Sequence, residues 1–321
     1  MTGGRAEIAE RLRTVLKGRV AANFSLAPFT TYRLGGPAAI YVEPSSVDDV
    51  TALGRFLRAE QAIADLPLLA LGRGSNVVVS DEGWPGIVIR LAPDGFSWIR
   101  PRAETTLSAG ASTPLPQLAN WSARRGLSGL EFLIAIPGSV GGAVRMNAGA
   151  HGAEIGNSLL EATVFTLDGA ELRTCARADL DLSYRHSNLT ESDLVLEATF
   201  EVEPETEDSV RARVEAYRRH RAETQPGAAS NAGSVFKNPS GDHAGRMVEA
   251  AGLKGFRVGG AEVSSLHANF FVAGPGATAQ DVYDLVAEVQ RRVREETGIE
   301  LAPEVRFAGR FRAAERGSLP A

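Results

Sequence analysis

Apolar residues recur at helical spacing in several stretches of the chain. After Ser46, for example, Val47, Val50, Leu53 and Leu57 fall on one face, which is typical of an amphipathic helix. Ser46 itself can cap the first turn of that helix. The same pattern predicts helices at residues 6–17, from 46 to 57, at 114–125, 208–222 and 243–251, and from Thr278 to the glycine at 298.

Runs of apolar or alternating residues predict the strands. The strongest hairpin signal is Asp168-Gly169, because this pair favours the tight turn that joins two antiparallel strands. The strands 159–167 and 171–176 flank this turn. Further strands are predicted at 38–43, 68–71, 77–79 and 86–91, as a pair within 96–110, and at 194–203 and 269–273.

Helices and strands are mixed along the chain without a repeat, so we expect an α+β fold. A larger N-terminal region of two subdomains is followed by a smaller α/β layer, and the acidic stretch Pro204–Asp208 is the expected boundary. The expected divisions are an N-terminal accessory helix in 1–22, one domain in 23–203, a second in 204–309, and a disordered tail in 310–321.

Composition narrows the class of protein. The chain has 321 residues, of which 44% are hydrophobic and 23% charged, so two domains with substantial cores are expected. A net charge of −5 argues against general nucleic-acid binding. Cys175 is the only cysteine, which excludes an internal disulfide. The histidines show no ligand spacing, so we expect no metal; they are His151, His186, His220, His243 and His267.

The sequence also bears on where in the cell the protein is located. Residues 1–13 lack an apolar signal core, and no run approaches the about 18 apolar residues of a membrane span. We therefore expect a cytoplasmic protein without membrane insertion.

A glycine-rich turn, Gly72 to Asn76, lies between two apolar runs. A dinucleotide-binding Rossmann loop must open a helix, but three valines follow here, and residues branched at Cβ prefer strands. The Rossmann interpretation is therefore rejected. The turn is either an anion-binding nest of backbone N–H groups, with Ser75 and Asn76 as further donors, or a plain glycine hairpin.

Glycine is densest between residues 126 and 150. Small residues in an ordered segment let the backbone pass close to a large flat ligand, or they form a tight crossover between layers. A nucleophile elbow is excluded because Pro137 stands where its first glycine would be. The chain also lacks the motifs of phosphate-loop NTPases and zinc peptidases.

The stretch Gly233 to Pro239 places a hydroxyl, Ser234, directly after a glycine, where backbone can approach a ligand closely. Lys237 and Asn238 add donors on the same segment. Alternatively, it is a hairpin strand with a surface lysine.

Five segments occur in this order along the chain: Gly-Arg-Gly-Ser-Asn at 72–76, the glycine-rich segment 130–150, Tyr-Arg-His-Ser at 184–187, Gly-Ser-Val-Phe-Lys-Asn-Pro at 233–239, and Pro-Glu-Val-Arg at 303–306. Together they resemble the UDP-N-acetylenolpyruvoylglucosamine reductase (UDP-N-acetylmuramate dehydrogenase) family. The resemblance covers roughly residues 23–309. Residues 30–203 also look like the PCMH-type FAD-binding domain of the vanillyl-alcohol-oxidase superfamily, and the short run from 184 to 194 resembles the family's shorter subtype.

The resemblance implies a reaction. NADPH reduces FAD, and the flavin then delivers hydride to C3 of the enolpyruvyl group of the UDP-sugar, giving UDP-N-acetylmuramate for peptidoglycan. By similarity, Ser234 donates the proton to C2. Arg185 and Glu304 match the other two catalytic positions, although in isolation they would be taken for a surface ion pair. Arg185 can fork onto a carboxylate, whereas Glu304 must be protonated or must orient a partner.

The resemblance also implies the ligand contacts and partners. For FAD these are Tyr32, Arg33, Gly72, Arg73, Gly74, Ser75, Asn76, Pro137, Gly138, Ser139, Gly141, Gly142, Asn147, Ala148 and Gly149. For the UDP-sugar they are Tyr184, Lys237, Asn238, His267 and Asn269. The flavin is expected to be dissociable, because the loop 72–76 has no histidine for a covalent link. We expect a monomer.

Two other functions stay open from the sequence. One is a different FAD oxidoreductase of the same superfamily, such as an oxidase of alcohols or sugars. The other is a catalytically silent UDP-sugar-binding protein. Both are disfavoured by the joint presence of Ser234, Arg185 and Glu304 in their family context.

Overall fold

The structure, a computed structural model, describes residues 2–60, 66–227 and 230–312. The chain forms two compact units. Unit 1 consists of Met1–Phe24, Ala39–Arg73 and Gly86–Arg221, and unit 2 consists of Ser25–Ala38, Gly74–Pro85 and Ala222–Ala321. Each unit has its own buried hydrophobic core.

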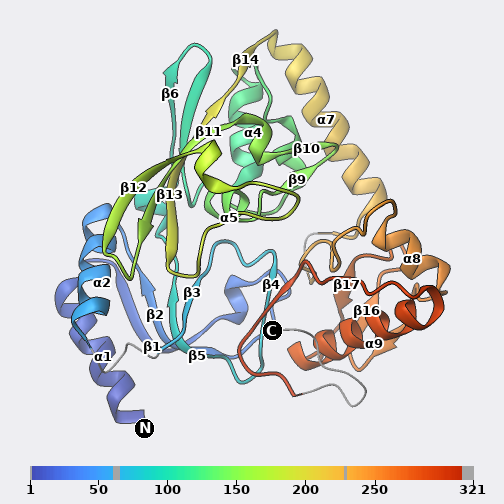
Figure 1. The fold of residues 1–321 in the computed structure, drawn as a ribbon, viewed down its shortest axis with the longest axis horizontal. Helices are drawn as coiled ribbons and strands as arrows, with labels where there is room; N and C mark the ends of the chain where they lie inside the picture. The colour runs from blue at the N-terminus through green and yellow to red at the C-terminus, as the bar shows by residue number, and fades with distance from the viewer. Residues whose placement is uncertain (1, 61–65, 228–229, 313–321) are drawn as a thin grey trace. The chain divides into compact units, whose positions relative to one another are not determined.

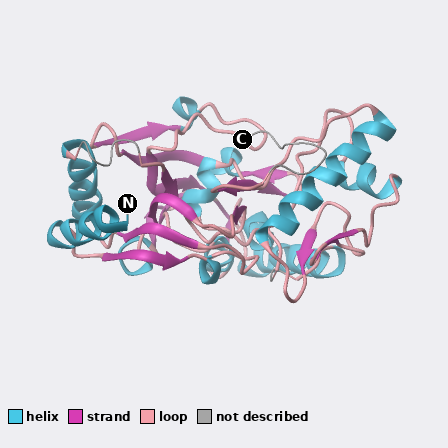
Figure 2. Cartoon of the chain, turned by 90° about the horizontal axis from the view of Figure 1, so that it is seen from below, coloured by secondary structure: helices cyan, strands magenta, loops and turns pink. Residues whose placement is uncertain are grey.

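The first layer of unit 1 is a sheet in the order β1-β2-β5-β3, in which β3 runs parallel to β5. Helices α1 and α2 lie side by side next to this sheet (Figures 1 and 2). The bounds are α1 Thr2–Val15, β1 Arg19–Ser25, β2 Pro37–Glu43, α2 Val47–Ala59, β3 Leu68–Ala70 and β5 Trp84–Ile89.

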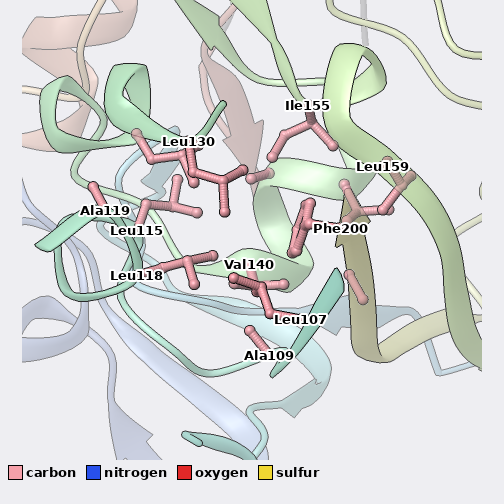
Figure 3. Close-up of a cluster of buried hydrophobic side chains, with 14 of the residues drawn as sticks. Leu107, Ala109, Leu115, Leu118, Ala119, Leu130, Val140, Ile155, Leu159 and Phe200 are labelled. Atoms are coloured by element: carbon pink, nitrogen blue, oxygen red, sulfur yellow. The ribbon is translucent and has the colours of Figure 1, made fainter. Parts of the chain in front are cut away.

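The second layer of unit 1 is an antiparallel sheet in the order β12-β11-β13-β7-β6. The short helix α5 packs on β13 and β7, and Val140 of α5 lies among Leu107, Ala109 and Phe200 of the sheet in Figure 3. The bounds are β6 Ile99–Ala103, β7 Thr106–Gly110, α4 Leu115–Ala123, α5 Val140–Arg145, β11 Leu159–Thr166, β12 Glu171–Ala176 and β13 Asp193–Glu201.

Short elements complete unit 1, and one long helix, α7, covers its edge. The buried residues Val210 and Val214 of α7 belong to the same core as the antiparallel sheet. The bounds are α3 Pro93–Phe96, β8 Leu127–Ser128, η3 Glu131–Ala135, β9 Gly149–Ala150, β10 Ala153–Glu154, α6 Ile155–Ser158, η4 Arg177–Leu180, β14 Glu203–Pro204 and α7 Glu207–Thr224.

Unit 2 is built around the long amphipathic helix α9, which packs against the antiparallel sheet β15-β16-β17 (Figure 1). A parallel pair, β4 and β18, joins the glycine-rich turn to the C-terminal part of the unit. The bounds are η1 Ala27–Phe29, β4 Val77–Val79, α8 Ala244–Ala250, β15 Arg257–Val258, β16 Ala261–Val263, β17 Phe271–Ala273, α9 Ala279–Thr297 and β18 Arg306–Ala308.

All six predicted helices are confirmed, and so are their caps where the sequence indicated them. The Ser46 side chain accepts from the Asp49 N–H, and Thr278 and Asp281 form a capping box at the start of α9. Gly298 ends α9 in the left-handed conformation, with φ of 75°. The hairpin at Asp168-Gly169 is confirmed, and Cys175 is a buried core residue.

Two interpretations differ from the structure. The strands on either side of the glycine-rich turn are not a hairpin: β3 pairs with β5, whereas β4 pairs with β18. The segment Gly233 to Pro239 is not a regular strand, because only isolated bridges hold it. The helix α5, inside the glycine-rich region, was not predicted, since Gly141 and Gly142 lower helical propensity.

The unit boundary also differs from the expected one. The sequence placed it near residue 204, but α7 up to Arg221 belongs to unit 1, because its apolar face completes the core of that unit. Two early segments, Ser25–Ala38 and Gly74–Pro85, belong to unit 2. Of the tail expected to be disordered, residues 313–321 lie outside the described residues. Within the described residues, no helix is long and apolar enough to cross a lipid bilayer.

The buried carboxylate of Asp49 connects α2 to the residues just before β1. Asp49 is 3% exposed and accepts from the N–H groups of Lys17, Gly18 and Ser45 and from the Ser45 hydroxyl. Burial raises the pKa of Asp49, but these hydrogen bonds outweigh it and hold the pKa below its ordinary value.

We predict that Asp49→Asn lowers the free energy of unfolding by about 1–3 kcal/mol at pH 7, because the amide cannot accept all four bonds. A depressed folded pKa means that this stabilisation is present above the carboxyl's ordinary pKa and is lost as the pH falls through the folded value. The variant should therefore lose less stability on acidification than the parent. Urea unfolding at several pH values measures this. Asp48→Asn, on the exposed face of the same helix turn, is the control; an equal loss there would contradict the assignment.

Candidate active site

Backbone pairing in unit 2 holds the segment that carries Ser234. On one side Ser234 bridges Phe270, and the Val235 N–H donates to the Asn269 carbonyl oxygen at 2.9 Å. On the other side the Glu304 N–H donates to the Val235 carbonyl oxygen at 2.7 Å. Ser234 is half-buried beside fully buried Val235. The pairing therefore fixes Ser234 and brings the backbone of Glu304 to the same short segment.

The side chain of Asn269 supplies a further clamp on this segment. Asn269 is 3% exposed, and its amide both accepts from the Phe236 N–H, at 2.9 Å, and donates to the Phe236 carbonyl oxygen, at 2.8 Å. It thus satisfies the backbone N–H and carbonyl oxygen of Phe236, which is also bridged to Pro303. His267 in turn accepts from the Asn269 N–H at Nδ1, and burial lowers its pKa. The imidazole is therefore held neutral, with its hydrogen on Nε2.

Lys237 and Asn238 follow on the same segment. The Lys237 N–H donates to the Ala302 carbonyl oxygen at 2.9 Å, so the backbone is paired while the side chain extends from a half-buried position. The Asn238 side chain accepts from the Ala244 N–H at 3.1 Å, which is the first residue of α8. The side-chain oxygen of Asn238 thus accepts from the first residue of α8, and Asn238 is an exposed residue.

Asn76 of the glycine-rich turn fixes the other catalytic candidate of unit 2. Its side chain donates to the Glu304 carbonyl oxygen at 3.0 Å, and its carbonyl oxygen accepts from the Arg306 N–H, also at 3.0 Å. Gly74 has φ of +62°, and a Cβ there would lie 2.2 Å from the Phe29 carbonyl oxygen, so only glycine fits. The turn 74–76 is therefore packed against η1 and the segment before β18.

Tyr32 and Arg33 belong to unit 2 as well. Tyr32 is 2% exposed, and its hydroxyl donates to the Phe271 carbonyl oxygen at 2.9 Å. Burial raises the pKa of Tyr32, so it stays neutral. Arg33 has a left-handed backbone, with φ of 58°. The Tyr32 side chain is therefore part of the core of unit 2, and the flavin contact expected of Tyr32 stays a prediction.

In unit 1, predicted flavin residues from two distant segments line one cavity of about 80 Å³. Gly72 and Ser139 meet there so closely that a Cβ on Gly72 would lie 2.8 Å from the Ser139 Oγ. A Cβ on Gly141 would lie 3.0 Å from that of Ala111, whereas one on Gly142 would meet only the Ser139 Oγ, at 3.9 Å. Gly142 therefore leaves its backbone open to a flat ligand, so the residues present fit a flavin, whereas Gly72 and Gly141 are required by close packing within the protein.

The same cavity has two charged residues that the sequence analysis missed, Arg145 and Asp193. Arg145 donates to the Thr190 carbonyl oxygen and pairs with Glu191 at 3.1 Å. Burial raises the pKa of Asp193, but hydrogen bonds from Thr166, Thr190 and Arg173 outweigh it and lower the pKa below its ordinary value. The only signal in the sequence for either residue is the position of Arg145 within the glycine-rich segment.

The third catalytic candidate, Arg185, lies in unit 1 on a tight turn. Ser183 and His186 exchange both backbone hydrogen bonds, at 3.2 and 3.0 Å, so Tyr184 and Arg185 form the tip. Arg185 has φ of 55°, and its guanidinium lies 4.9 Å from the centre of the Tyr184 ring. Tyr184 is 46% exposed, which is high for an aromatic residue.

The structure thus brings Ser234, Asn269, His267, Lys237, Asn238, Glu304 and Asn76 together within unit 2, and Gly72, Ser139, Gly141 and Gly142 together within unit 1. Gly149 is bonded to Arg185. Around the cavity, Pro137 and Gly138 precede Ser139, and the Gly138 carbonyl oxygen accepts from the Leu115 N–H. Arg73 and Ser75 lie next to glycines of the turn.

Two protein-family models match parts of the chain. Residues 225–308 match the family "UDP-N-acetylenolpyruvoylglucosamine reductase, C-terminal domain", and residues 38–175 match the family "FAD binding domain". The first match contains Ser234 and Glu304, and the second contains the cavity-lining residues from Ala70 to Arg145.

Relatives cover nearly the whole chain. The UDP-N-acetylenolpyruvoylglucosamine reductase of Rhodopseudomonas palustris (strain BisB5) is 42% identical over 92% of this chain and 93% of its own length. That of Bacillus subtilis is 39% identical over 94% and 98%. The crystal structure of the Thermus caldophilus enzyme has a TM-score of 0.76 at 34% identity and covers 92% of this chain and 100% of its own. The chain therefore belongs to the UDP-N-acetylenolpyruvoylglucosamine reductase family.

Proposed function

We propose that the protein is an FAD-dependent oxidoreductase that uses NADPH to reduce UDP-N-acetyl-3-O-(1-carboxyvinyl)-glucosamine to UDP-N-acetylmuramate in peptidoglycan precursor synthesis. One observation carries the proposal: within the segment that matches the reductase family, backbone pairing brings Ser234 and Glu304 to one place. The enzyme acts on small molecules, and we expect it to work in the cytoplasm as a monomer.

The bound flavin would take electrons from NADPH and pass them to the enolpyruvyl carbon. The chain's own contribution is the cavity of unit 1, where Gly142 leaves the backbone open to a flat ring and the missing Cβ of Gly72 makes room for the Ser139 hydroxyl. Arg145 and Asp193 add one charge of each sign to the same lining. The loop 74–76, with Arg73, offers backbone and side-chain donors to the phosphates.

Ser234 is the proposed proton donor to C2 of the substrate. A hydroxyl is a weak acid, but it is adequate against an enolate-like species if the alkoxide left behind is stabilised. The double pairing of the segment with Asn269 and Glu304 limits the freedom of Ser234, which matters because proton transfer depends on hydrogen-bond geometry.

Arg185 is the proposed partner of the substrate carboxylate. The planar guanidinium can make two parallel hydrogen bonds to a carboxylate and stabilise the negative charge that develops there. Glu304 cannot stabilise an anion while ionised, so we assign it an orienting role, either protonated or as an acceptor from the substrate. Its backbone is fixed by Val235 and Asn76, which gives the side chain a defined origin.

The remaining residues are proposed to bind the UDP-sugar. Lys237 suits an interaction with the diphosphate, and Tyr184 offers an exposed ring for the sugar or base. His267 has its Nε2–H as a donor. The Asn238 side chain accepts a hydrogen bond from the Ala244 N–H at the start of α8. We assign Asn269 to holding Phe236, because both ends of its amide are already bonded there.

A direct assay separates this function from the two alternatives. The purified protein should be yellow and should oxidise NADPH quickly only when the enolpyruvyl sugar is added, with slow oxygen consumption. Absorbance at the flavin bands and NADPH consumption give the result. Rapid oxygen uptake with an alcohol would instead identify an oxidase. A colourless protein that binds UDP-sugar would identify a silent binding protein.

We also predict that Arg185→Lys lowers kcat/KM for the enolpyruvyl sugar by about ten- to a hundredfold, because lysine keeps the charge but lacks the fork. Steady-state kinetics at fixed NADPH measure this loss. Arg177→Lys, an exposed arginine of η4 in the same unit, is the matched control and should leave kcat/KM unchanged. Near-parental turnover in Arg185→Lys would remove Arg185 from the mechanism.

A further inference from the structure

The turn of residues 183–187, called here the arginine turn, is held by side-chain hydrogen bonds to one earlier segment. The Asn147 side chain donates to the Ser183 carbonyl oxygen at 2.9 Å. The Ser187 hydroxyl donates to the Arg145 carbonyl oxygen at 2.6 Å. The two bonds attach the two ends of the turn to neighbouring positions of the glycine-rich segment.

A third bond holds the tip itself. The Arg185 guanidinium donates from Nη2 to the Gly149 carbonyl oxygen at 3.0 Å. The partners in the earlier segment are therefore residues 145, 147 and 149, so alternate residues of one short stretch fix the start, tip and end of the arginine turn.

Asn147 is the centre of this stretch. It is 0% exposed, and its Oδ1 accepts from the Gly156 N–H at 2.8 Å while its Nδ2 donates to Ser183. A Cβ on Gly156 would lie 3.2 Å from that Oδ1, so the fit is close. Because the side chain is wholly enclosed, no part of it is open to a cofactor or substrate. The resemblance had placed Asn147 among the flavin contacts.

The backbone conformation of Arg185 explains why the arginine turn needs these three hydrogen bonds. Arg185 has φ of 55°, in the left-handed region that costs a non-glycine residue roughly 1 kcal/mol or more, and such a conformation persists only where the surroundings enforce it. Asn147 is left-handed as well, with φ of 40°, but asparagine tolerates this region better than most residues.

We propose that Asn147 is a positioning residue for Arg185, which acts through the arginine turn and not by contact with flavin or substrate. The proposal rests on the proposed function, because that function gives Arg185 its role at the substrate carboxylate. Asn147 sets the backbone from which the guanidinium extends, and Gly149, two residues on, holds the guanidinium itself.

The test variant is Asn147→Gly, because glycine accepts φ of 40° without strain while the side-chain bonds to Ser183 and Gly156 are removed. In the FAD-loaded enzyme, the oxidation of reduced flavin by the enolpyruvyl sugar should slow about tenfold or more, since small misplacements of a catalytic group are costly. The dissociation constant of FAD and the rate of flavin reduction by NADPH should stay within about twofold of the parent, because no flavin contact is lost.

A second measurement reads the turn directly. Amide hydrogen exchange in a peptide covering residues 180–190 should become faster in Asn147→Gly, because the Ser183–His186 bonds open more often. The matched control is Asn157→Ala, which removes a comparable side-chain bond, to the Glu154 N–H, without touching the arginine turn. It should change neither the exchange nor the substrate step. Ser187→Ala removes another hydrogen bond that holds the arginine turn. If Asn147→Gly does not fold, Ser187→Ala should slow the substrate step and speed up the amide exchange in its place.

Coupling to Arg185 completes the test. In an Arg185→Ala background, Asn147→Gly should cause no further loss in the substrate step, because the group that it positions is gone. Weaker FAD binding with unchanged exchange in 180–190 would overturn the proposal and make Asn147 a cofactor residue. Fully additive losses would overturn it as well. If Arg185→Ala is itself as fast as the parent, the proposed role of Arg185 fails, while faster exchange in Asn147→Gly would still support Asn147 as the clamp of the turn.

Discussion

Irregular backbone at the functional segments must find hydrogen-bond partners, and in this protein three asparagine side chains supply some of them. A carboxamide offers one acceptor and two donors, so it can take the place of a missing neighbouring strand. Asn269 does this for Phe236, Asn147 for Ser183, and Asn76 for Glu304. Each of these bonds lies one or two residues from a proposed catalytic side chain, or on it.

The choice of a neutral amide has a consequence for pH. Where the fold uses carboxylates for comparable tasks, at Asp49 and Asp193, the bonds depend on the ionised form and weaken as the carboxyl is protonated. An asparagine clamp does not titrate. The hydrogen bonds that these asparagines make to the backbone near Ser234 and Arg185 are therefore not lost through protonation of the asparagine side chain itself.

The sequence predicted the regular elements well, because their periodicity and caps are local signals. Ser46, Thr278 and Gly298 mark helix ends in the structure as expected. It could not predict that β4 pairs with β18, because that pairing joins positions more than two hundred residues apart. It also could not show which of the expected ligand residues have buried side chains. Asn147, Asn269 and Tyr32 are expected at the ligands from the resemblance, and the structure shows their side chains hydrogen-bonded inside the protein.

The central claim is that Ser234, on its doubly paired segment, gives the proton to the substrate. The most direct measurement mixes reduced, FAD-loaded Ser234→Ala with the enolpyruvyl sugar under anaerobic conditions and follows the return of flavin absorbance. The account predicts that this step becomes slower by about two orders of magnitude or more, in line with the loss of a general acid, while reduction by NADPH keeps its parental rate. Reoxidation by the sugar at the parental rate would contradict it.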